Sequence, residues 1–250
     1  MLISGQGTDH HSWDHVLEDF AAHYRVILMD HRGTGESDKP QESAGYTTRR
    51  FAGDVLCVLD HAGVQRAHVY GISMGGRIAQ WLAIDHPNRV GALVLGGTTP
   101  GNAHGVRRPP DVDRVMANRP QDPERAIRFY LDPFVSPAWA EKHPEYVAAA
   151  RHKVMHPIPR HAQRFHYQAS EGHDAWAQLP NVLAPTLVIH GGEDRVNPTA
   201  NAQLLAGRIP KAELHIVQGG RHAYYEEFRQ EASQVVLDFL GRHHLRPSPQ

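Results

Sequence analysis

Ser73 has the sequence context of an activated nucleophile. It is the centre of the pentapeptide Gly71-Ile72-Ser73-Met74-Gly75, which follows an apolar run and opens a segment with helical spacing. Between a strand and a helix, Gly-x-Ser-x-Gly holds its serine at the tip of a sharp turn with the hydroxyl exposed. The flanking glycines leave room for the chain to approach closely. A packing turn is the alternative, and the strand-turn-helix context favours a nucleophile.

A serine nucleophile needs a base, and the base needs an acid that orients it. Asp194 and His222 each follow a short apolar run, at residues 186–190 and 213–217, that predicts a buried strand. The carboxyl ends of parallel strands share one edge of a sheet, where ligand sites form. Three loops at that edge would bring Ser73, Asp194 and His222 together. We therefore predict that they form a catalytic triad.

The elements that must position these groups alternate between strands and helices. Most of the apolar runs are continuous, which is typical of strands buried on both faces of a parallel sheet. The alternation predicts right-handed βαβ units in a three-layer α/β sandwich with a mostly parallel sheet. Strands are predicted at residues 2–4, 26–30, 68–72, 92–95, 186–190 and 213–217, and helices at residues 13–22, 48–62, 74–86, 199–207 and 223–240.

The strand pattern stops between about residues 100 and 180, in a stretch rich in Pro, Arg and His. Helical pieces at residues 111–118, 123–131, 137–151 and 159–171 predict a helical cap. We expect a core of residues 1–100 and 181–242, a cap of residues 101–180 and a flexible tail at 243–250. Aromatic residues of the cap would line an apolar pocket, or else pack the cap onto the core. The aromatic residues predicted to contact substrate are Phe129, Trp139 and Trp176.

At these residues the chain resembles the α/β-hydrolase fold family, over nearly its whole length. Residues 30–37, Asp-His-Arg-Gly-Thr-Gly-Glu-Ser, are similar to the Asp-x-Arg-Gly-x-Gly-x-Ser turn of many members. The segment around Ser73 is similar to enol-lactonases and to cofactor-free perhydrolases or haloperoxidases. The resemblance implies a serine-dependent hydrolase, and it implies Asp194 rather than the adjacent Glu193 as the acid.

Ester hydrolysis passes through a tetrahedral oxyanion, which two backbone N–H donors usually stabilise. One donor is predicted to be the N–H of Met74, the residue after the nucleophile. Residues Gly5-Gln6-Gly7 resemble the family's oxyanion loop, with Ser4 in place of the usual histidine. By position Gln6 would supply the second N–H, and a plain tight turn is the alternative.

Two basic side chains near these motifs allow two interpretations each. His10 follows the oxyanion loop and borders either the pocket or solvent. Arg77 lies one helical turn after Ser73, where it meets a substrate carboxylate or caps a helix interface. The arginines of the cap likewise indicate an anionic substrate or a solvated face; they are Arg107, Arg108, Arg125, Arg128, Arg160 and Arg164.

The N-terminus departs from the family pattern. Members carry two strands before the one predicted at residues 2–4, and in this chain that strand pair is missing. Residues 26–30 would then form an edge, and an uncovered apolar edge invites pairing with another chain. The start of the protein lies upstream, or a homodimer covers the edge; the sequence leaves both open.

Composition restricts the partners. Lys plus Arg is 26 and Asp plus Glu is 27, a formal net charge of -1, so no global field favours nucleic acid or an anionic membrane. No apolar run approaches the roughly 20 residues of a spanning helix, and no signal-peptide core is present, so a cytoplasmic protein is expected. The single cysteine, Cys57, lies among apolar residues and is predicted to be a buried thiol.

The chain has 20 histidines, which raises the question of a metal. His152 and His156 have the i, i+4 spacing of helical ligands, but no Glu lies between them and Pro157 follows at once. No dinucleotide or P-loop fingerprint is present. We expect no metal and no cofactor.

The sequence therefore predicts a serine hydrolase that cleaves a carboxylic ester or lactone through an acyl-enzyme. Three alternatives stay open. The same triad could serve perhydrolysis, haloperoxidase chemistry or cleavage of a carbon–carbon bond in a dienoic acid. The scaffold could be a non-catalytic small-molecule binding protein, or the histidines could serve a metalloenzyme.

Overall fold

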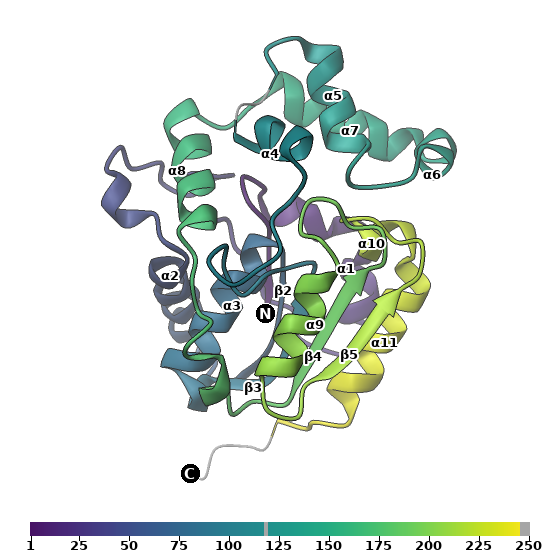
Figure 1. Cartoon of the computed structure of the whole chain (residues 1–250). Helices are drawn as coiled ribbons and strands as arrows, with labels where there is room; N and C mark the ends of the chain where they lie inside the picture. The colour runs from purple at the N-terminus through teal and green to yellow at the C-terminus, as the bar shows by residue number, and fades with distance from the viewer. Residues whose placement is uncertain (118–119, 246–250) are drawn as a thin grey trace.

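A five-stranded sheet forms the centre of the protein in the computed structural model, which describes residues 1–117 and 120–245 (Figure 1). The strand order is β1-β2-β3-β4-β5, and every neighbouring pair is parallel. Their carboxyl ends therefore meet at one edge. The strands are β1 (Leu2–Ile3), β2 (Ala67–Ile72), β3 (Val90–Gly96), β4 (Thr186–Gly191) and β5 (Glu213–Val217).

Side chains of the central strands alternate between two apolar layers. On β3, Leu93 and Leu95 belong to the layer on one face of the sheet, whereas Ala92 and Val94 belong to the layer on the other. Burial on both faces explains why this strand is a continuous apolar run. The first layer is covered by α2 (Thr48–His61), α3 (Met74–Asp85) and α9 (Ala200–Arg208), and the second by α1 (Asp14–Ala21), α10 (Tyr224–Glu227) and α11 (Arg229–Gly241).

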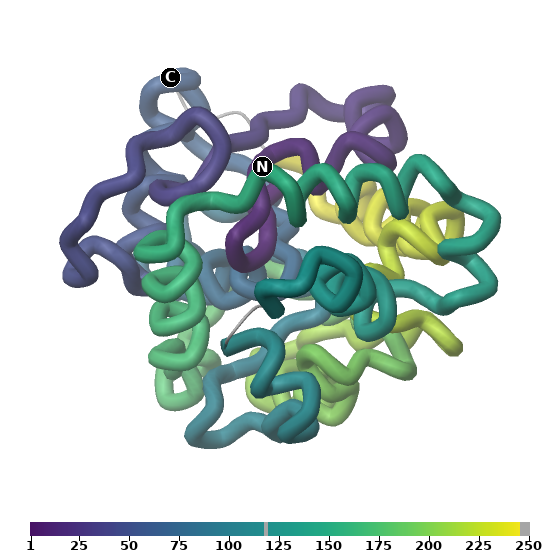
Figure 2. The backbone as a smooth tube through the Cα atoms, turned by 90° about the horizontal axis from the view of Figure 1, so that it is seen from above, coloured from purple at the N-terminus to yellow at the C-terminus, as the bar shows by residue number. Residues whose placement is uncertain are grey.

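A helical region is inserted between β3 and β4. Asp122 and Ser136 cap two of its helices by accepting a backbone N–H, and a proline follows each cap at the first helical position. The region lies across the core when the molecule is seen from above (Figure 2). Its helices are α4 (Pro110–Ala117), α5 (Pro123–Leu131), α6 (Pro137–Lys142), α7 (Pro144–Met155) and α8 (Arg160–Glu171).

Short 3₁₀ helices join several of these elements: η1 (His10–Trp13), η2 (Ser43–Gly45), η3 (Pro87–Arg89) and η4 (Leu179–Asn181). Within residues 1–117 and 120–245, no helix is long and apolar enough to cross a membrane. Residue 118 of one predicted helix and residues 246–250 of the predicted tail lie outside the described residues. At the start of that tail, His243 still donates its N–H to Leu240 O at 3.0 Å.

The predicted strand at residues 26–30 is wrong. This segment runs beside β1, and Leu2 donates its N–H to Ile27 O at 3.0 Å, but it is not a strand. Because β1 has only two residues, it offers too short a ladder for a longer strand to pair with. The alternating side chains of the segment still pack: Ile27 on one apolar layer of the core and Leu28 on the other.

Two predicted helices are divided, and one predicted burial is wrong. The helix expected over residues 137–151 is interrupted at His143, because Pro144 cannot continue the hydrogen-bond ladder. The helix expected over residues 223–240 is interrupted at Phe228. Cys57 is exposed rather than buried. Helical spacing turns Val55 and Leu59 toward the core, which leaves position 57 on the outer side of α2.

The end of β1 lies against the start of α3. A Cβ atom at Gly75 would lie 2.1 Å from Ile3 O and 2.7 Å from Ser4 O. Both obstacles are backbone atoms, which cannot rotate away as a flexible side chain would. Glycine at this position therefore sets how closely the N-terminal loop approaches the turn that carries Ser73.

Gly75→Ala should lower the free energy of unfolding by about 2 kcal/mol or more, as overpacking does. Gly53→Ala is the matched control, because Gly53 lies within α2 and a Cβ there meets nothing within 4 Å. It should be neutral or stabilise by about 0.5–1 kcal/mol. Urea denaturation measures both, and equal changes in the two variants would contradict the close approach.

Candidate active site

Ser73 occupies a strained turn between β2 and α3. Its φ is 58° and its ψ is -117°, a conformation that non-glycine residues rarely adopt. Two hydrogen bonds hold it: Ser73 N–H donates to Gly96 O at 2.9 Å, and Thr98 Oγ1 donates to Ser73 O at 2.7 Å. The residue is partly exposed. The backbone thus presents a serine at the carboxyl edge of the sheet, with the N-terminus of α3 behind it.

His222 and Asp194 are in direct contact. Nδ1 of His222 lies 2.7 Å from Oδ2 of Asp194, and both side chains are buried. A Cβ at Gly97 would lie 3.5 Å from each of them, while the adjacent Gly96 accepts the N–H of Ser73. Ser73, Asp194 and His222 therefore all lie next to the Gly96–Gly97 segment.

No hydrogen bond joins Ser73 Oγ to His222 in the part of the chain that the structure describes. Catalytic hydrogen bonds are often long in a free enzyme and shorten only when substrate binds. The imidazole is oriented by Asp194 Oδ2 through its Nδ1, which leaves Nε2 as the nitrogen available to the serine.

All four acceptor positions of the Asp194 carboxylate face N–H groups. Oδ1 accepts from Val196 N–H at 2.8 Å and Asn197 N–H at 2.9 Å, and Oδ2 faces His222 Nδ1 at 2.7 Å and His190 Nε2 at 3.2 Å. Burial raises the pKa of Asp194, but the charge of His222 and the N–H groups of both imidazoles outweigh it and hold the pKa well below its ordinary value. The carboxylate is therefore ionised at neutral pH. The alternative acid, Glu193, is exposed.

Asn197 connects the acid to its surroundings. Its side chain donates to Gly97 O at 2.6 Å and accepts from Arg77 at 3.1 Å, and its carbonyl faces His190 Nε2 at 2.7 Å. Neither Asn197 nor His190 is predicted from the sequence as part of the site. The available signal was weak: a histidine at the end of the apolar run of β4.

The N-terminal loop lies against the serine. A Cβ at Gly5 would lie 3.5 Å from Ser73 Cβ. The N–H of Gly7 is engaged by His166 Nδ1 at 3.2 Å, whereas the N–H of Gln6 has no acceptor among the described residues. Met74 is the first residue of α3, so its N–H has no carbonyl one turn back within the helix. Among residues 1–117 and 120–245, the backbone N–H groups of Gln6 and Met74 are thus both left without an acceptor.

Two buried histidines hold the segments around this loop. His31 Nε2 donates to Ser4 O at 3.1 Å. His166, on α8, accepts the N–H of Gly7 through Nδ1 and donates through Nε2 to Arg32 O at 2.8 Å. Burial lowers the pKa of His166 to about 4 and also lowers that of His31. The neutral His166 ring links the inserted region to the loop at residues 5–7.

His10 contacts Asp30 rather than an open pocket. Both its backbone N–H and its Nδ1 lie 2.8 Å from Asp30 Oδ1. The side-chain hydrogen bond to Asp30 raises the pKa of His10. Asp30 also accepts the N–H of Glu36 at 2.9 Å, and a Cβ at Gly35 would collide with the same carboxylate at 1.9 Å. His10 therefore braces the turn at residues 30–37.

Arg77 is buried in the interface between α3 and the inserted region. Its guanidinium donates to Ser170 O at 2.8 Å, at the end of α8, and to Asn197 Oδ1 at 3.1 Å. Burial, with a smaller effect of Arg108, lowers the pKa of Arg77 to about 10. These contacts agree with a helix-interface role. Among the cap arginines, Arg108 is nearly buried and paired with Glu171.

Of the aromatic residues of the inserted region, Phe134 contacts His222. Its ring centroid lies 5.2 Å from that of His222, in an edge-to-face arrangement at 80°. The predicted Phe129 packs edge-on against Phe134 at 6.3 Å, one ring further away. Within the described residues, Trp139 and Trp176 make no hydrogen bond or ring contact with Ser73, Asp194 or His222.

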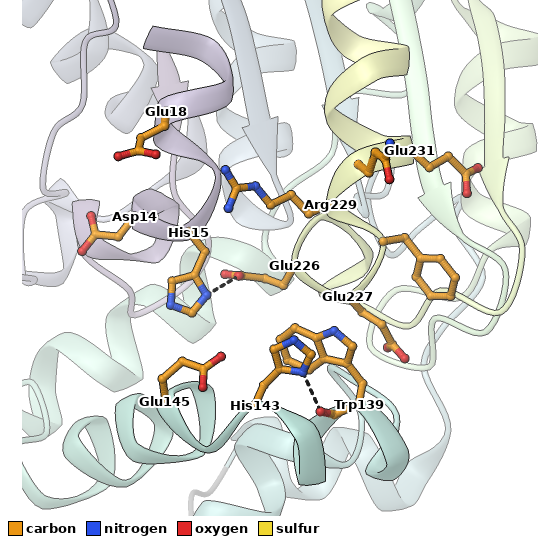
Figure 3. Close-up of a pocket in the computed structure, with 12 residues that line it drawn as sticks. Asp14, His15, Glu18, Trp139, His143, Glu145, Glu226, Glu227, Arg229 and Glu231 are labelled. Carbon is orange, nitrogen blue, oxygen red and sulfur yellow. Dashed lines mark hydrogen bonds and ion pairs between the residues drawn. The ribbon is translucent and has the colours of Figure 1, made fainter. Parts of the chain in front are cut away.

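Both tryptophans have other partners. Trp139 stacks on His143 at 3.8 Å, on the wall of a separate cavity of about 760 Å³ that is rich in carboxylates such as Glu226 (Figure 3). Trp176 stacks on His104 at 5.1 Å, and Arg208 lies over its ring at 4.9 Å. Neither this cavity nor a smaller one beside Asp194 is lined by Ser73.

The segment that follows α5 is bonded to the loop that carries His222. Pro133 O accepts the N–H of His222 at 3.4 Å, and Phe134 O accepts the N–H of Ala223 at 2.8 Å. Ser136 donates its N–H to the Glu227 carboxylate at 2.9 Å. These hydrogen bonds from the inserted region therefore hold the backbone of His222 and Ala223 in place.

The histidine pair at the end of α7 lies on the surface: His152 is in the helix and His156 follows it. His152 and His156 stack at 4.3 Å. In residues 1–117 and 120–245, no group of three or more His, Cys, Asp or Glu side chains is placed to hold a metal ion.

The structure combines a three-layer α/β architecture with a strained serine at the carboxyl edge of its sheet. Comparisons with known proteins find the same fold. Residues 1–228 match the family model of the alpha/beta hydrolase fold. The chain belongs to the α/β-hydrolase fold family.

Three relatives with named chemistry span almost the whole chain. A 2-hydroxy-6-oxononadienedioate/2-hydroxy-6-oxononatrienedioate hydrolase of Paraburkholderia phymatum is 32% identical over 252 residues, 97% of this chain and 86% of the relative. The solved enol-lactonase of Burkholderia xenovorans LB400 is 27% identical, with a TM-score of 0.84 over 96% of this chain and 90% of that chain. A solved N-acyl homoserine lactone degrading enzyme is 32% identical, with a TM-score of 0.80 over 95% and 91%.

The low pKa of His166 predicts a loss of stability in acid. The unfolded chain takes up this proton below about pH 6.5 and the folded chain only near pH 4, so folding is progressively disfavoured between these values. His166→Gln should reduce this loss by about 2 kcal/mol near the middle of the window. His31 and His173, whose pKa values are also lowered, keep part of the slope. Urea denaturation across the window measures it, and identical slopes in parent and variant would contradict the assignment.

Proposed function

We propose that this protein is a serine hydrolase that cleaves a carboxylic ester or lactone. The observation that carries the proposal is the buried Asp194–His222 contact beside the strained turn of Ser73. Three N–H groups donate to Asp194 and the His190 N–H, shared with Asn197 O, faces it at 3.2 Å, which together hold it as the anion that an acid partner of a catalytic imidazole must be. The free N–H groups of Gln6 and Met74 add the donors that acyl transfer needs.

The mechanism follows from these groups. Ser73 Oγ attacks the carbonyl carbon while His222 Nε2 takes the hydroxyl proton, and Asp194 stabilises the imidazolium that forms. The oxyanion is held by the N–H groups of Gln6 and Met74. The tetrahedral intermediate collapses, the bond to the leaving oxygen breaks, and His222 delivers its proton to that oxygen. Water, deprotonated by His222, then attacks the acyl-enzyme, and Ser73 leaves with its proton restored.

The relatives support this substrate class. The enol-lactonase and the N-acyl homoserine lactone degrading enzyme both act on cyclic esters by name, and both align over nearly the full length of this chain. In this proposal residues 101–180 are the cap that covers the site, and Phe134 is the ring nearest to the base.

A second candidate is cleavage of a carbon–carbon bond in a 2-hydroxy-6-oxo dienoic acid. It is favoured by the dienedioate/trienedioate hydrolase relative at 32% identity. The same triad and oxyanion donors would serve it, because a carbonyl is again the electrophile. Assaying purified protein with both a lactone panel and a ring-cleavage-type dienoate separates the two.

Ser73→Ala should lower kcat by about 10⁴-fold or more, because the triad loses its nucleophile while the fold is retained. Ser43→Ala is the matched control, since Ser43 is exposed on η2, and it should keep parental activity. Labelling with a fluorophosphonate probe should be present in the parent and in Ser43→Ala and lost in Ser73→Ala. Parental turnover by Ser73→Ala would refute the mechanism, and absence of labelling in the parent would favour the binding-protein alternative.

A further inference from the structure

His190 lies next to the predicted triad, although no step of the mechanism uses it. It is the penultimate residue of β4, is fully buried, and points toward the loop that carries Asp194. Its Nε2 lies 2.7 Å from Asn197 O and 3.2 Å from Asp194 Oδ2. Both atoms are acceptors without a proton, so Nε2 must carry the hydrogen.

The other ring nitrogen fixes the tautomer. Nδ1 of His190 is buried and has no hydrogen-bond partner among the described residues. A proton on Nδ1 would leave a buried N–H unpaired, which costs more than an unpaired lone pair on nitrogen. The arrangement therefore favours the neutral Nε2–H form, with its N–H directed at Asn197 O and its positive end facing the Asp194 carboxylate.

Asp194 Oδ2 is thus shared between two imidazoles. One, His222, must accept a proton during the proposed reaction. The other, His190, keeps a fixed N–H. A donor that faces a carboxylate withdraws part of its negative charge and weakens its pull on a neighbouring cation. The same N–H ties the carbonyl of Asn197, whose backbone N–H binds Oδ1 of the same carboxylate.

We propose that His190 is a positioning residue for the acid of the triad: it anchors the Asp194–Asn197 loop and moderates the basicity of His222. This inference rests on the proposed hydrolase function. Other charged or titratable groups reach the same carboxylate. Arg77 donates to Asn197 Oδ1, which belongs to the residue bonded to the carboxylate. Burial and, to a smaller extent, the Asp194 charge raise the pKa of Tyr224, on α10. Both are unchanged in the variants below.

His190→Leu should move the acidic limb of the pH profile of kcat/KM to higher pH by roughly half a unit, because Asp194 then stabilises the His222 imidazolium more strongly. His190→Gln, which keeps a side-chain N–H at the reach of Nε2, should restore the limb toward its parental position. A purely packing role would lower stability or kcat and leave the limb in place. An unmoved limb in His190→Leu, or a downward shift, would overturn the inference.

His215→Leu is the matched control. His215 lies on β5 opposite Ile189, the residue before His190, and it also faces a carboxylate, Glu231, at 2.8 Å. The His215→Leu variant removes a histidine–carboxylate pair between β5 and α11 that does not involve Asp194. The control should keep the parental acidic limb, so a shift as large as that of His190→Leu would show that the effect is not specific to Asp194.

A second measurement uses the parent protein and needs neither a variant nor turnover. Nitrogen-15 NMR of the free protein should show His190 as the Nε2–H tautomer. An Nδ1–H tautomer would overturn the inference even if the enzyme is active. If Ser73 fails to label and no ester is cleaved, the proposed function fails, while the NMR result still decides whether His190 holds the Asp194 loop.

Discussion

The buried negative charge of Asp194 is the constraint on which the rest of the site depends. An ionised carboxylate without water is expensive unless every lone pair finds a donor. Two backbone N–H groups from its own loop, the imidazole of His190 on β4 and the imidazole of His222 in the loop after β5 supply those donors. Satisfying one anion therefore fixes the turn after β4, the orientation of His222 and, through Asn197, the carbonyl of Gly97.

The inserted helical region is part of the same arrangement. His166 on α8 holds the loop at residues 5–7 through Gly7, Arg77 bonds the end of α8, and the segment after α5 bonds the backbone of His222. Each contact is a hydrogen bond to a backbone group of the partner segment. It therefore sets the position of that segment whatever side chain the partner residue carries. The region thus holds the segments that carry Ser73 and His222 and the loop at residues 5–7.

Much of the fold was predictable because the strands are buried on both faces. Continuous apolar runs and a 3.6-residue pattern located the five strands, the covering helices and the insertion. The failures have local causes. Residues 26–30 have a strand-like sequence but lie beside a two-residue partner. His143–Pro144 breaks a helix that periodicity alone extends, and Cys57 faces outward because apolar sequence neighbours of a helical residue point in different directions.

By itself the sequence determined the residue types and their order: a serine in a Gly-x-Ser-x-Gly turn, an aspartate and a histidine after two later strands, and glycines where the chain must pass closely. Tertiary structure alone decided which polar groups meet. It placed His190 and Asn197 on Asp194, His10 on Asp30, Phe134 against His222, Trp139 on His143 and Trp176 on His104. The reason is physical: periodicity encodes which face of an element is buried, whereas a hydrogen bond depends on positions in loops far apart in sequence, which only the assembled sheet defines.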